Sequence, residues 1–207
     1  MPSAPTPQKL LVFYGSYRAD RTGIHLANFL VDRFATRGHD TRLIDAKAIG
    51  LPMLDRMYKE YADGQAPAPM ESLAQQIRGA DAFVFVTGEY NWGMQPGLKN
   101  LTDHYLEEWY WRPAAIASYS AGRLSGARSN SAWHGTLSEM GMVVISSTLT
   151  VGPIGQTLDH DSKPIGELGH VSKGDLDKAL AAADKGFKTW RRVSSFERGK
   201  ILRKAGD

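Results

Sequence analysis

The sequence predicts an α/β fold in which a doubly wound, five-stranded parallel sheet of order 2-1-3-4-5 carries helices on both faces. Short, nearly continuous apolar runs alternate along the chain with segments whose apolar residues recur at helical spacing. This alternation is typical of parallel strands joined by crossover helices. Polar, glycine-bearing loops follow the first, third and fourth apolar runs. Because ligands of such sheets bind beyond the carboxyl ends of the strands, we expect these loops to form the site.

The strands are expected at the apolar runs, since a strand buried on both faces needs apolar side chains on both sides. They cover residues 9–14, 41–44, 82–87, 113–119 and 142–147. Helices are expected where apolar residues fall three or four positions apart. They cover residues 22–38, 70–78, 98–109, 127–140 and 172–190, and the last is expected to pack on the sheet. Residues 45–69 are expected to form a loop with one helical turn, and residues 148–170 an extended or loop segment.

The composition indicates one sizeable domain, because the chain has 207 residues of which 42% are apolar. We expect a disordered tail at residues 1–8, the domain at residues 9–190 and a basic tail at residues 191–207. The net charge of +3 is modest and lacks the clustering of a nucleic-acid interface. Residues 1–8 contain three prolines and no apolar stretch, unlike a signal peptide or a membrane span. We therefore expect a cytoplasmic protein with no nucleic-acid or membrane partner.

The loop after the first strand has the features of a phosphate site. Residues 15–23 lie between an apolar strand and the start of an amphipathic helix. A helix N-terminus presents unpaired N–H groups and the positive end of the helix dipole. Two hydroxyls, Ser16 and Thr22, and two guanidiniums, Arg18 and Arg21, surround that point and suit a phosphate dianion. The alternative is that the hydroxyls only stabilise the turn and that both arginines are solvated.

The loop after the third strand favours a flat, heteroaromatic ligand. Tyr90 and Trp92 can lie against a ring face, and the backbone N–H groups of residues 91–93 can reach ring nitrogens and carbonyls. Gly93 and Gly97 let the backbone approach a ligand closely. Composition alone favours the alternative that both aromatics are ordinary packing residues at the end of a loop, and the neighbouring glycines are what favour a ligand. A phosphate at one end and a flat ring at the other together describe flavin mononucleotide (FMN).

Other common site types are excluded by their missing motifs. The chain has no cysteine and no paired or HExxH histidine spacing, so we expect no metal site. No Gly-Lys-Ser/Thr follows the first loop, and no Gly-x-Ser-x-Gly elbow is present. His160, between Asp159 and Asp161, is expected to lie in a solvated turn.

Three motifs, taken together, resemble the flavin loops of the NAD(P)H-dependent FMN reductase family over residues 9–147. They are Gly15-Ser16-x-Arg18-x-x-Arg21-x-Gly23, then Glu89-Tyr90-Asn91 with Pro96-Gly97-x-Lys99-Asn100, and then Ser118-Tyr119 with Gly122 and Gly126. The order and the spacing both match. The third loop departs from the pattern, since Ser120 and Ala121 stand where the family commonly has glycine.

The resemblance implies a flavodoxin-like fold, non-covalently bound FMN and a set of cofactor-binding residues. These are Ser16, Arg18, Arg21, Thr22 and Gly23 for the phosphate, Glu89, Tyr90, Asn91, Trp92 and Gly93 for the ring, and Ser120, Ala121 and Gly122 in the third loop. No side chain is assigned a catalytic role, because the flavin carries the redox chemistry.

The implied activity passes hydride from NADPH or NADH to the flavin and on to a flavin, quinone, azo or similar acceptor, by a ping-pong mechanism. The resemblance also suggests a homodimer or a homotetramer, and the cluster Tyr105, Trp109, Tyr110 and Trp111 suggests an interface. The alternative is that all four aromatics belong to the core. A flavodoxin-like one-electron carrier, or an FMN-binding module without NAD(P)H oxidation, is the alternative. Flavodoxins are usually strongly acidic, whereas this chain has a net charge of +3.

Overall fold

The computed structural model describes residues 6–165 together with residues 194, 197 and 200. The chain divides into two compact units, residues 1–166 and 167–207, and the fold below belongs to the first. The expected domain end at residue 190 falls within the second unit. The expected helix at residues 172–190 lies outside the described residues.

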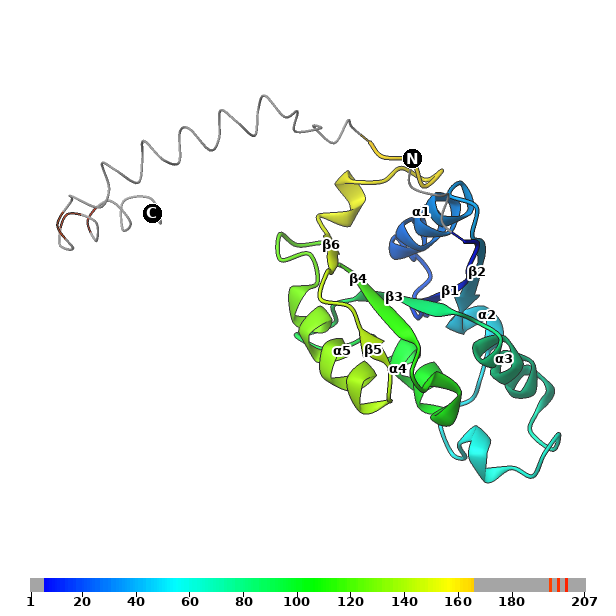
Figure 1. The fold of residues 1–207 in the computed structure, drawn as a ribbon. Coiled ribbons are helices and arrows are strands. Elements are labelled where there is room, and N and C mark those ends of the chain that lie inside the picture. The colour runs from blue at the N-terminus through cyan, green and yellow to red at the C-terminus, as the bar shows by residue number, and fades with distance from the viewer. Residues whose placement is uncertain (1–5, 166–193, 195–196, 198–199, 201–207) are drawn as a thin grey trace. The chain divides into compact units, whose positions relative to one another are not determined.

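The sheet has the strand order that the sequence predicts, β2-β1-β3-β4-β5, and all of its pairs are parallel (Figure 1). Its strands are β1 (Lys9–Tyr14), β2 (Asp40–Asp45), β3 (Ala82–Gly88), β4 (Pro113–Tyr119), β5 (Val143–Val144) and an additional β6 (Leu149–Val151). At the centre, Phe13 of β1 lies opposite Ile44 on one side and Phe85 on the other. Every residue of β1 after Lys9 is buried, which explains its continuous apolar sequence.

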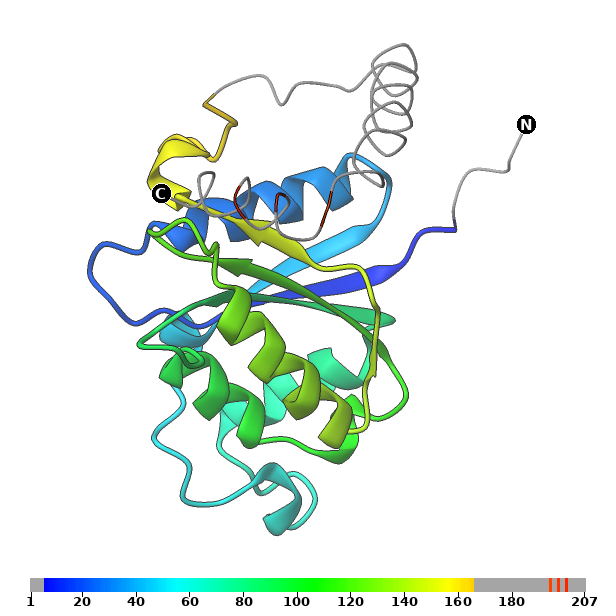
Figure 2. The same ribbon diagram turned by 90° about the vertical axis from the view of Figure 1, so that its left-hand side faces the viewer.

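Helices cover both faces of the sheet, as Figure 2 shows. They are α1 (Gly23–Ala35), α2 (Ala46–Ile49), α3 (Ala68–Arg78), α4 (Pro96–Asp103) and α5 (Ala127–Glu139), with short 3-10 helices at Tyr58–Glu60, Glu107–Trp109 and Ile154–Gln156. Helix α1 and the segment around Ile154 pack on one face, and residues of α2 to α5 pack on the other. The loops at the carboxyl ends of β1, β3 and β4 are thereby held by packed elements on either side.

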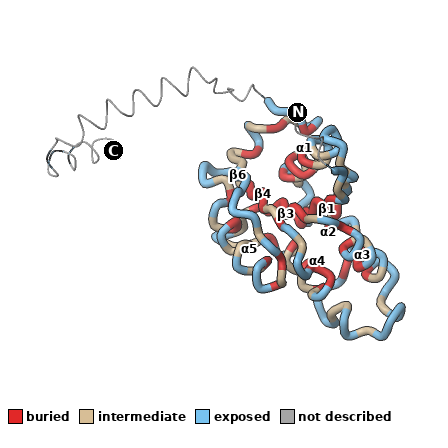
Figure 3. The backbone as a smooth tube through the Cα atoms, viewed as in Figure 1, coloured by how far each residue is buried: buried red, intermediate tan, exposed pale blue. Residues whose placement is uncertain are grey.

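Figure 3 shows that the buried residues gather in the strands and on the helices beside them. The larger core lies on the face covered by α2 to α5 and is built around aromatic rings. Phe13 stacks on Phe85 with ring centroids 5.2 Å apart, and Trp133 of α5 stacks on Phe85 at 5.8 Å. The Trp109 ring meets the edge of Phe83 at 5.1 Å. Such stacked and edge-on pairs stabilise a core beyond the area that they bury.

The expected helix over residues 98–109 is wrong in its second half. Helix α4 ends at Asp103, and a separate 3-10 helix holds Glu107–Trp109. Side-chain hydrogen bonds replace the helical ladder here: the Trp109 indole donates to the carbonyls of Thr102 and Tyr105 at 3.3 and 3.2 Å, and the Leu106 N–H donates to the Glu108 carboxylate at 3.2 Å. Tyr105 and Trp109 are 1% and 0% exposed, so they belong to the core rather than to a surface patch.

The fifth strand is divided, whereas the sequence predicts one strand at residues 142–147. Strand β5 pairs with the first two residues of β4, and β6 pairs with its last three, from Ala117 to Tyr119. Between the two lie residues of the Ser146-Ser147-Thr148 run, whose hydroxyls compete with ladder hydrogen bonds. The expected loop at residues 45–69 likewise contains α2, capped by the Asp45 carboxylate on the Lys47 N–H. Among the described residues, no helix is long and apolar enough to cross a membrane.

Candidate functional site

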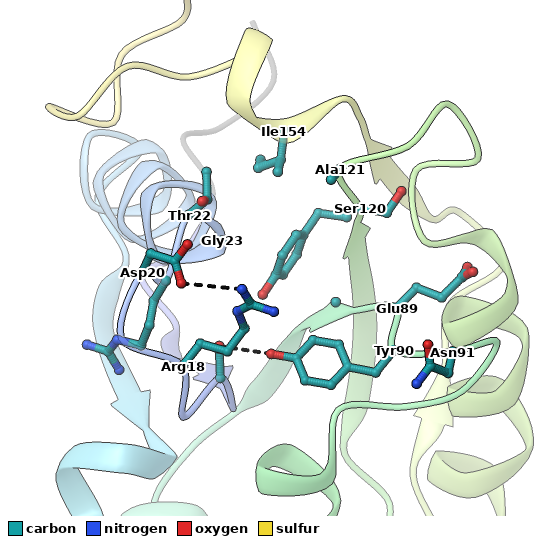
Figure 4. A pocket seen from close by; sticks show the side chains of 14 residues that line it. Arg18, Asp20, Thr22, Gly23, Glu89, Tyr90, Asn91, Ser120, Ala121 and Ile154 are labelled. Carbon is teal, nitrogen blue, oxygen red and sulfur yellow. Dashed lines mark hydrogen bonds and ion pairs between the residues drawn. The ribbon is translucent and has the colours of Figure 1, made fainter.

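A cavity of about 450 Å³ opens where the three polar loops meet, at the carboxyl ends of β1, β3 and β4 (Figure 4). The position is the switch point of the sheet, between β1 and β3, where doubly wound folds bind ligands. Its lining residues are Ser16, Arg18, Asp20, Arg21, Thr22, Gly23, Gly88, Glu89, Tyr90, Asn91, Tyr119, Ser120, Ala121 and Ile154. The lining thus gathers residues far apart in the sequence.

The first loop brings an uncapped helix N-terminus to the cavity. Thr22, at the N-cap of α1, makes no capping bond with its side chain, and Thr22 and Gly23 both line the cavity. The N–H groups of Ile24 and His25 donate to the carbonyls of Arg21 and Thr22 at 2.9 and 3.2 Å, so the N–H of Gly23, at the first position of the helix, is the one that faces an anion. The Arg18 side chain is 64% exposed and pairs with Asp20 at 3.5 Å. This end of the cavity therefore suits a phosphate.

Arg21 forms an ion pair that the sequence does not indicate. Its Nη1 lies 2.6 Å from the Asp45 carboxylate at the end of β2, and its guanidinium lies 5.7 Å from the centroid of the Tyr14 ring. The side chain lines the cavity while its charge is partly neutralised by Asp45. Among the two arginines of the loop, Arg18 is thus the more available to an anion.

The floor of the cavity contains the buried ring of Tyr119. Its hydroxyl accepts a hydrogen bond from the Gln95 side-chain amide at 2.8 Å and lies 3.5 Å from the Tyr14 hydroxyl. Burial raises the pKa of Tyr119 far above its ordinary value and also raises the pKa of Tyr14, so both phenols stay neutral. The Tyr119 ring lies so close to Gly23 that a Cβ at Gly23 would overlap the ring. A Cβ at Gly88 would lie 2.9 Å from the Cζ atom of Tyr119.

The loop after β3 forms a tight two-residue turn. The N–H groups of Tyr90 and Gly93 donate to each other's carbonyls at 3.1 and 2.8 Å, and Asn91 and Trp92 between them have positive φ angles of 46° and 75°. The Tyr90 hydroxyl lies 3.2 Å from the Ser16 hydroxyl, which joins this loop to the first. Figure 4 shows the Glu89 side chain pointing away from the centre of the cavity. Its carboxylate pairs with Arg128 of α5.

The third loop contributes Ser120 and Ala121 and is tied to the segment after β6. The Ser120 N–H donates to the Val151 carbonyl at 3.3 Å, and the Ile154 N–H donates to the Ser120 carbonyl at 3.0 Å. The Ser120 hydroxyl donates to the Gly122 carbonyl at 2.9 Å. These bonds bring Ile154 to the rim of the cavity.

Most of the sequence-predicted binding residues meet at this cavity, but three do not line it: Trp92, Gly93 and Gly122. Trp92 is 71% exposed and stacks on Arg128 instead. Four lining residues were missed: Asp20, Gly88, Tyr119 and Ile154. Gly88 and Tyr119 end their strands, so the rule that ligands bind at strand ends could have found them. Ile154 carries no sequence signal, because it lies 32 residues after Gly122, the last of the predicted binding residues, in a segment that matches no motif.

Two relatives of known activity match most of this chain. It is 27% identical to an NAD(P)H-dependent FMN reductase of Saccharomyces cerevisiae over 163 residues, which cover 71% of this chain and 82% of that protein. It is 28% identical to a 2-hydroxy-1,4-benzoquinone reductase of a Burkholderia species over 189 residues, which cover 89% of this chain and 96% of that protein.

The structure is also similar to that of a flavoenzyme, the NAD(P)H:acceptor oxidoreductase FerB of Paracoccus denitrificans. The TM-score is 0.65 at 22% identity, over 88% of this chain and 96% of that one, which indicates a shared fold. The aldehyde dehydrogenase family model matches residues 154–207, about a quarter of the chain. The model of the NADPH-dependent FMN reductase family matches residues 8–155, which include all three loops of the cavity, and the chain belongs to this family.

Proposed function

We propose that this protein is an FMN-dependent oxidoreductase that passes hydride from NAD(P)H to a quinone, azo compound, free flavin or similar acceptor. The observation that carries the proposal is the cavity at the switch point, which joins an uncapped helix N-terminus and arginines at one end to an aromatic turn at the other. The family and the printed activities of the two relatives support the same reaction class.

The chemistry of the donor groups fits the phosphate end of FMN. Ser16, Arg18, Thr22 and the N–H of Gly23 would hold it, with Arg21 supporting from its pair with Asp45. A phosphate dianion is favoured by hydroxyl donors, a forked guanidinium and the helix dipole together. The close approach of Gly23 to Tyr119 leaves no room for a side chain, so the backbone itself forms the wall of this cradle.

The ring end would be held by the backbone of residues 89–91 and the side chains of Tyr90 and Asn91, with Ser120 and Ala121 from the third loop. Tyr90 and Tyr119 offer apolar ring surface, whereas the turn and the third loop offer backbone donors. When bound, FMN supplies the hydride-accepting and hydride-donating chemistry. The side chains of this chain bind, orient and exclude water, and the phenols of Tyr14 and Tyr119 stay neutral at neutral pH, because burial raises the pKa of both.

Donor and acceptor would use the same open side of the cavity in turn. Shared use of one face gives ping-pong kinetics, with parallel lines in double-reciprocal plots. The rival function is a one-electron carrier. The net charge of +3 argues against it, since such carriers dock on partners through strongly acidic surfaces.

Assembly into a homodimer or homotetramer belongs to the same proposal. Tyr110, Trp111, Val143 and Ile145 are 39%, 84%, 55% and 43% exposed, and backbone hydrogen bonds join the segment of the two aromatics to that of β5. An exposed apolar cluster of this kind is typical of an interface. Light scattering at micromolar concentration is expected to give a multiple of the 22.8 kDa chain mass, and a Trp111→Glu variant is expected to dissociate. A monomeric parent protein would contradict the proposal.

Two further parts of the proposal concern organisation and location. The flavin-binding unit begins near residue 9 and includes the loops up to Ile154. We place the protein in the cytoplasm, where nicotinamide dinucleotides are supplied. Cell fractionation tests the location, and limited proteolysis of the full chain tests the boundary.

Binding of FMN to the apoprotein, followed by quenching of flavin fluorescence, tests the proposal. FMN is expected to bind much more tightly than FAD, because the helix N-terminus is built for one terminal phosphate. Arg18→Ala is expected to weaken binding about tenfold, since a charge-assisted hydrogen bond contributes on the order of 1.5–3 kcal/mol and exposure lowers its contribution. Arg37→Ala, at an exposed arginine just beyond the other end of α1, is the matched control. Equal affinities for Arg18→Ala and the parent would refute the role of Arg18.

A further inference from the structure

The turn at residues 90–93 has an unfavourable backbone. Asn91 and Trp92 both have positive φ angles, 46° and 75°, in a two-residue hairpin turn closed by the bonds between Tyr90 and Gly93. Turns of this geometry favour glycine, because a side chain is disfavoured at positive φ. A bulky indole at such a position persists only where the surrounding structure holds it. Tyr90 and Asn91 line the cavity, so whatever holds the turn also sets the shape of the site.

Arg128 of helix α5 contacts both the residue before the turn and the tip of the turn. The Glu89 side chain, only 5% exposed, places one carboxylate oxygen on the backbone N–H of Arg128 at 3.2 Å and the other on its guanidinium. The same guanidinium lies 4.3 Å from the centroid of the Trp92 ring. Arg128 therefore forms an ion pair with Glu89, the residue before the turn, and a cation–π contact with Trp92, at the tip of the turn.

The geometry suits arginine and no other residue. The planar guanidinium presents its edge to a carboxylate and its face to an indole at the same time, whereas a lysine ammonium is a point charge. The Nε of Arg128 is buried and has no hydrogen-bond partner among the described residues.

From these contacts we infer that Arg128 is a positioning residue, which fixes the turn at residues 90–93 so that Tyr90 and Asn91 face the flavin ring. This role rests on the proposed function. It differs from direct binding of the phosphates of NADPH, because the Glu89 carboxylate already neutralises the guanidinium. Trp92 has a role in the same arrangement. It lies outside the cavity, and its contact with Arg128 helps to keep the turn in place.

The first arm of the test uses the apoprotein and needs no flavin. Removing Arg128 alone would leave the buried Glu89 carboxylate unpaired, so the main variant is Glu89→Gln/Arg128→Met, which removes both charges. Hydrogen exchange followed by mass spectrometry on residues 88–95 is expected to be at least tenfold faster in this variant, while the melting temperature stays close to that of the parent. Trp92→Ala, which removes an exposed side chain, is expected to accelerate exchange in the same segment without disturbing the fold.

The second arm measures the dissociation constant of FMN. We expect it to rise about tenfold in Glu89→Gln/Arg128→Met, less in Arg128→Lys, which keeps the ion pair, and not at all in Arg37→Met. Parental exchange rates in both the double variant and Trp92→Ala would overturn the positioning role. Fast exchange with unchanged FMN affinity would overturn its connection to the cofactor. If the parent protein itself binds no FMN, the proposed function fails, whereas the exchange arm still decides whether Arg128 holds the turn.

Discussion

Single residues at the cavity are constrained chiefly by the Tyr119 ring. It fills the space beside Gly23 and Gly88, and its hydroxyl is held by Gln95. The sequence identifies Gly23 as part of a phosphate loop, yet it gives no reason for a glycine at the first position of a helix. The reason is a contact with a residue almost a hundred positions away, which no local pattern contains.

Gly23→Ala is expected to lower the free energy of unfolding by about 1–3 kcal/mol, since the added Cβ would overlap the Tyr119 ring. Gly135→Ala is the matched control, because Gly135 lies inside α5 with open space around its Cβ position. There the substitution is expected to stabilise the protein by up to ~1 kcal/mol. Urea denaturation measures both, and equal effects at the two positions would contradict the packing role of Tyr119.

Because the phenols of Tyr119 and Tyr14 are buried, we expect the protein to lose stability at alkaline pH. Burial raises the pKa of Tyr119 and of Tyr14 above the ordinary value of 10.0, so the unfolded chain releases these protons at lower pH than the folded one. Their contribution is constant below pH 10.0, and stability falls as the pH rises above it. The free energy of unfolding can be measured by urea denaturation at neutral pH and at a pH above the ordinary phenol pKa. Between these two conditions, Tyr119→Phe is expected to lose less of this free energy than the parent. An identical loss would mean that Tyr119 ionises freely in the folded protein.

Among the elements, those with long regular patterns are predicted well and those shaped by side-chain hydrogen bonds are not. Strand β1 and helices α1, α3 and α5 follow their apolar periodicity closely. The prediction of a helix over residues 98–109 is wrong after Asp103. There the Trp109 indole donates to two backbone carbonyls, and the Glu108 carboxylate accepts from a backbone N–H, in place of helical hydrogen bonds. Periodicity shows which side chains share a face, but it does not show whether the backbone between them is continuous.

The aromatic cluster after α4 separates into core and surface residues, and substitutions in the two groups are expected to change stability by very different amounts. Trp109 is 0% exposed, so Trp109→Ala is expected to lower the free energy of unfolding by about 3–5 kcal/mol. Trp111 is 84% exposed, so Trp111→Ala is expected to change the free energy of unfolding of the chain by less than about 0.5 kcal/mol. Thermal and urea unfolding at low protein concentration measure both. A large effect at Trp111 under these conditions would show that it packs within its own chain.

Across the whole molecule, the strand order and the meeting of three distant loops could be predicted because both follow from general rules of parallel sheets. The division of the fifth strand and the arrival of Ile154 could not, because β6 and the following segment are placed by pairing with β4 and Ser120. Likewise, nothing in the sequence indicates that Glu89 turns from the cavity to Arg128. The location of the site is thus more predictable than the direction of its side chains.

The central claim is that this cavity holds FMN so that a nicotinamide can reduce it. Anaerobic mixing of the FMN-loaded protein with NADPH, and separately with NADH, followed by the visible absorbance of the bound flavin, tests that claim most directly. We predict rapid bleaching by at least one of the two donors and recovery of the absorbance on adding a quinone. If neither donor bleaches the flavin at a rate that could support turnover, the reductase function is wrong and the one-electron carrier takes its place.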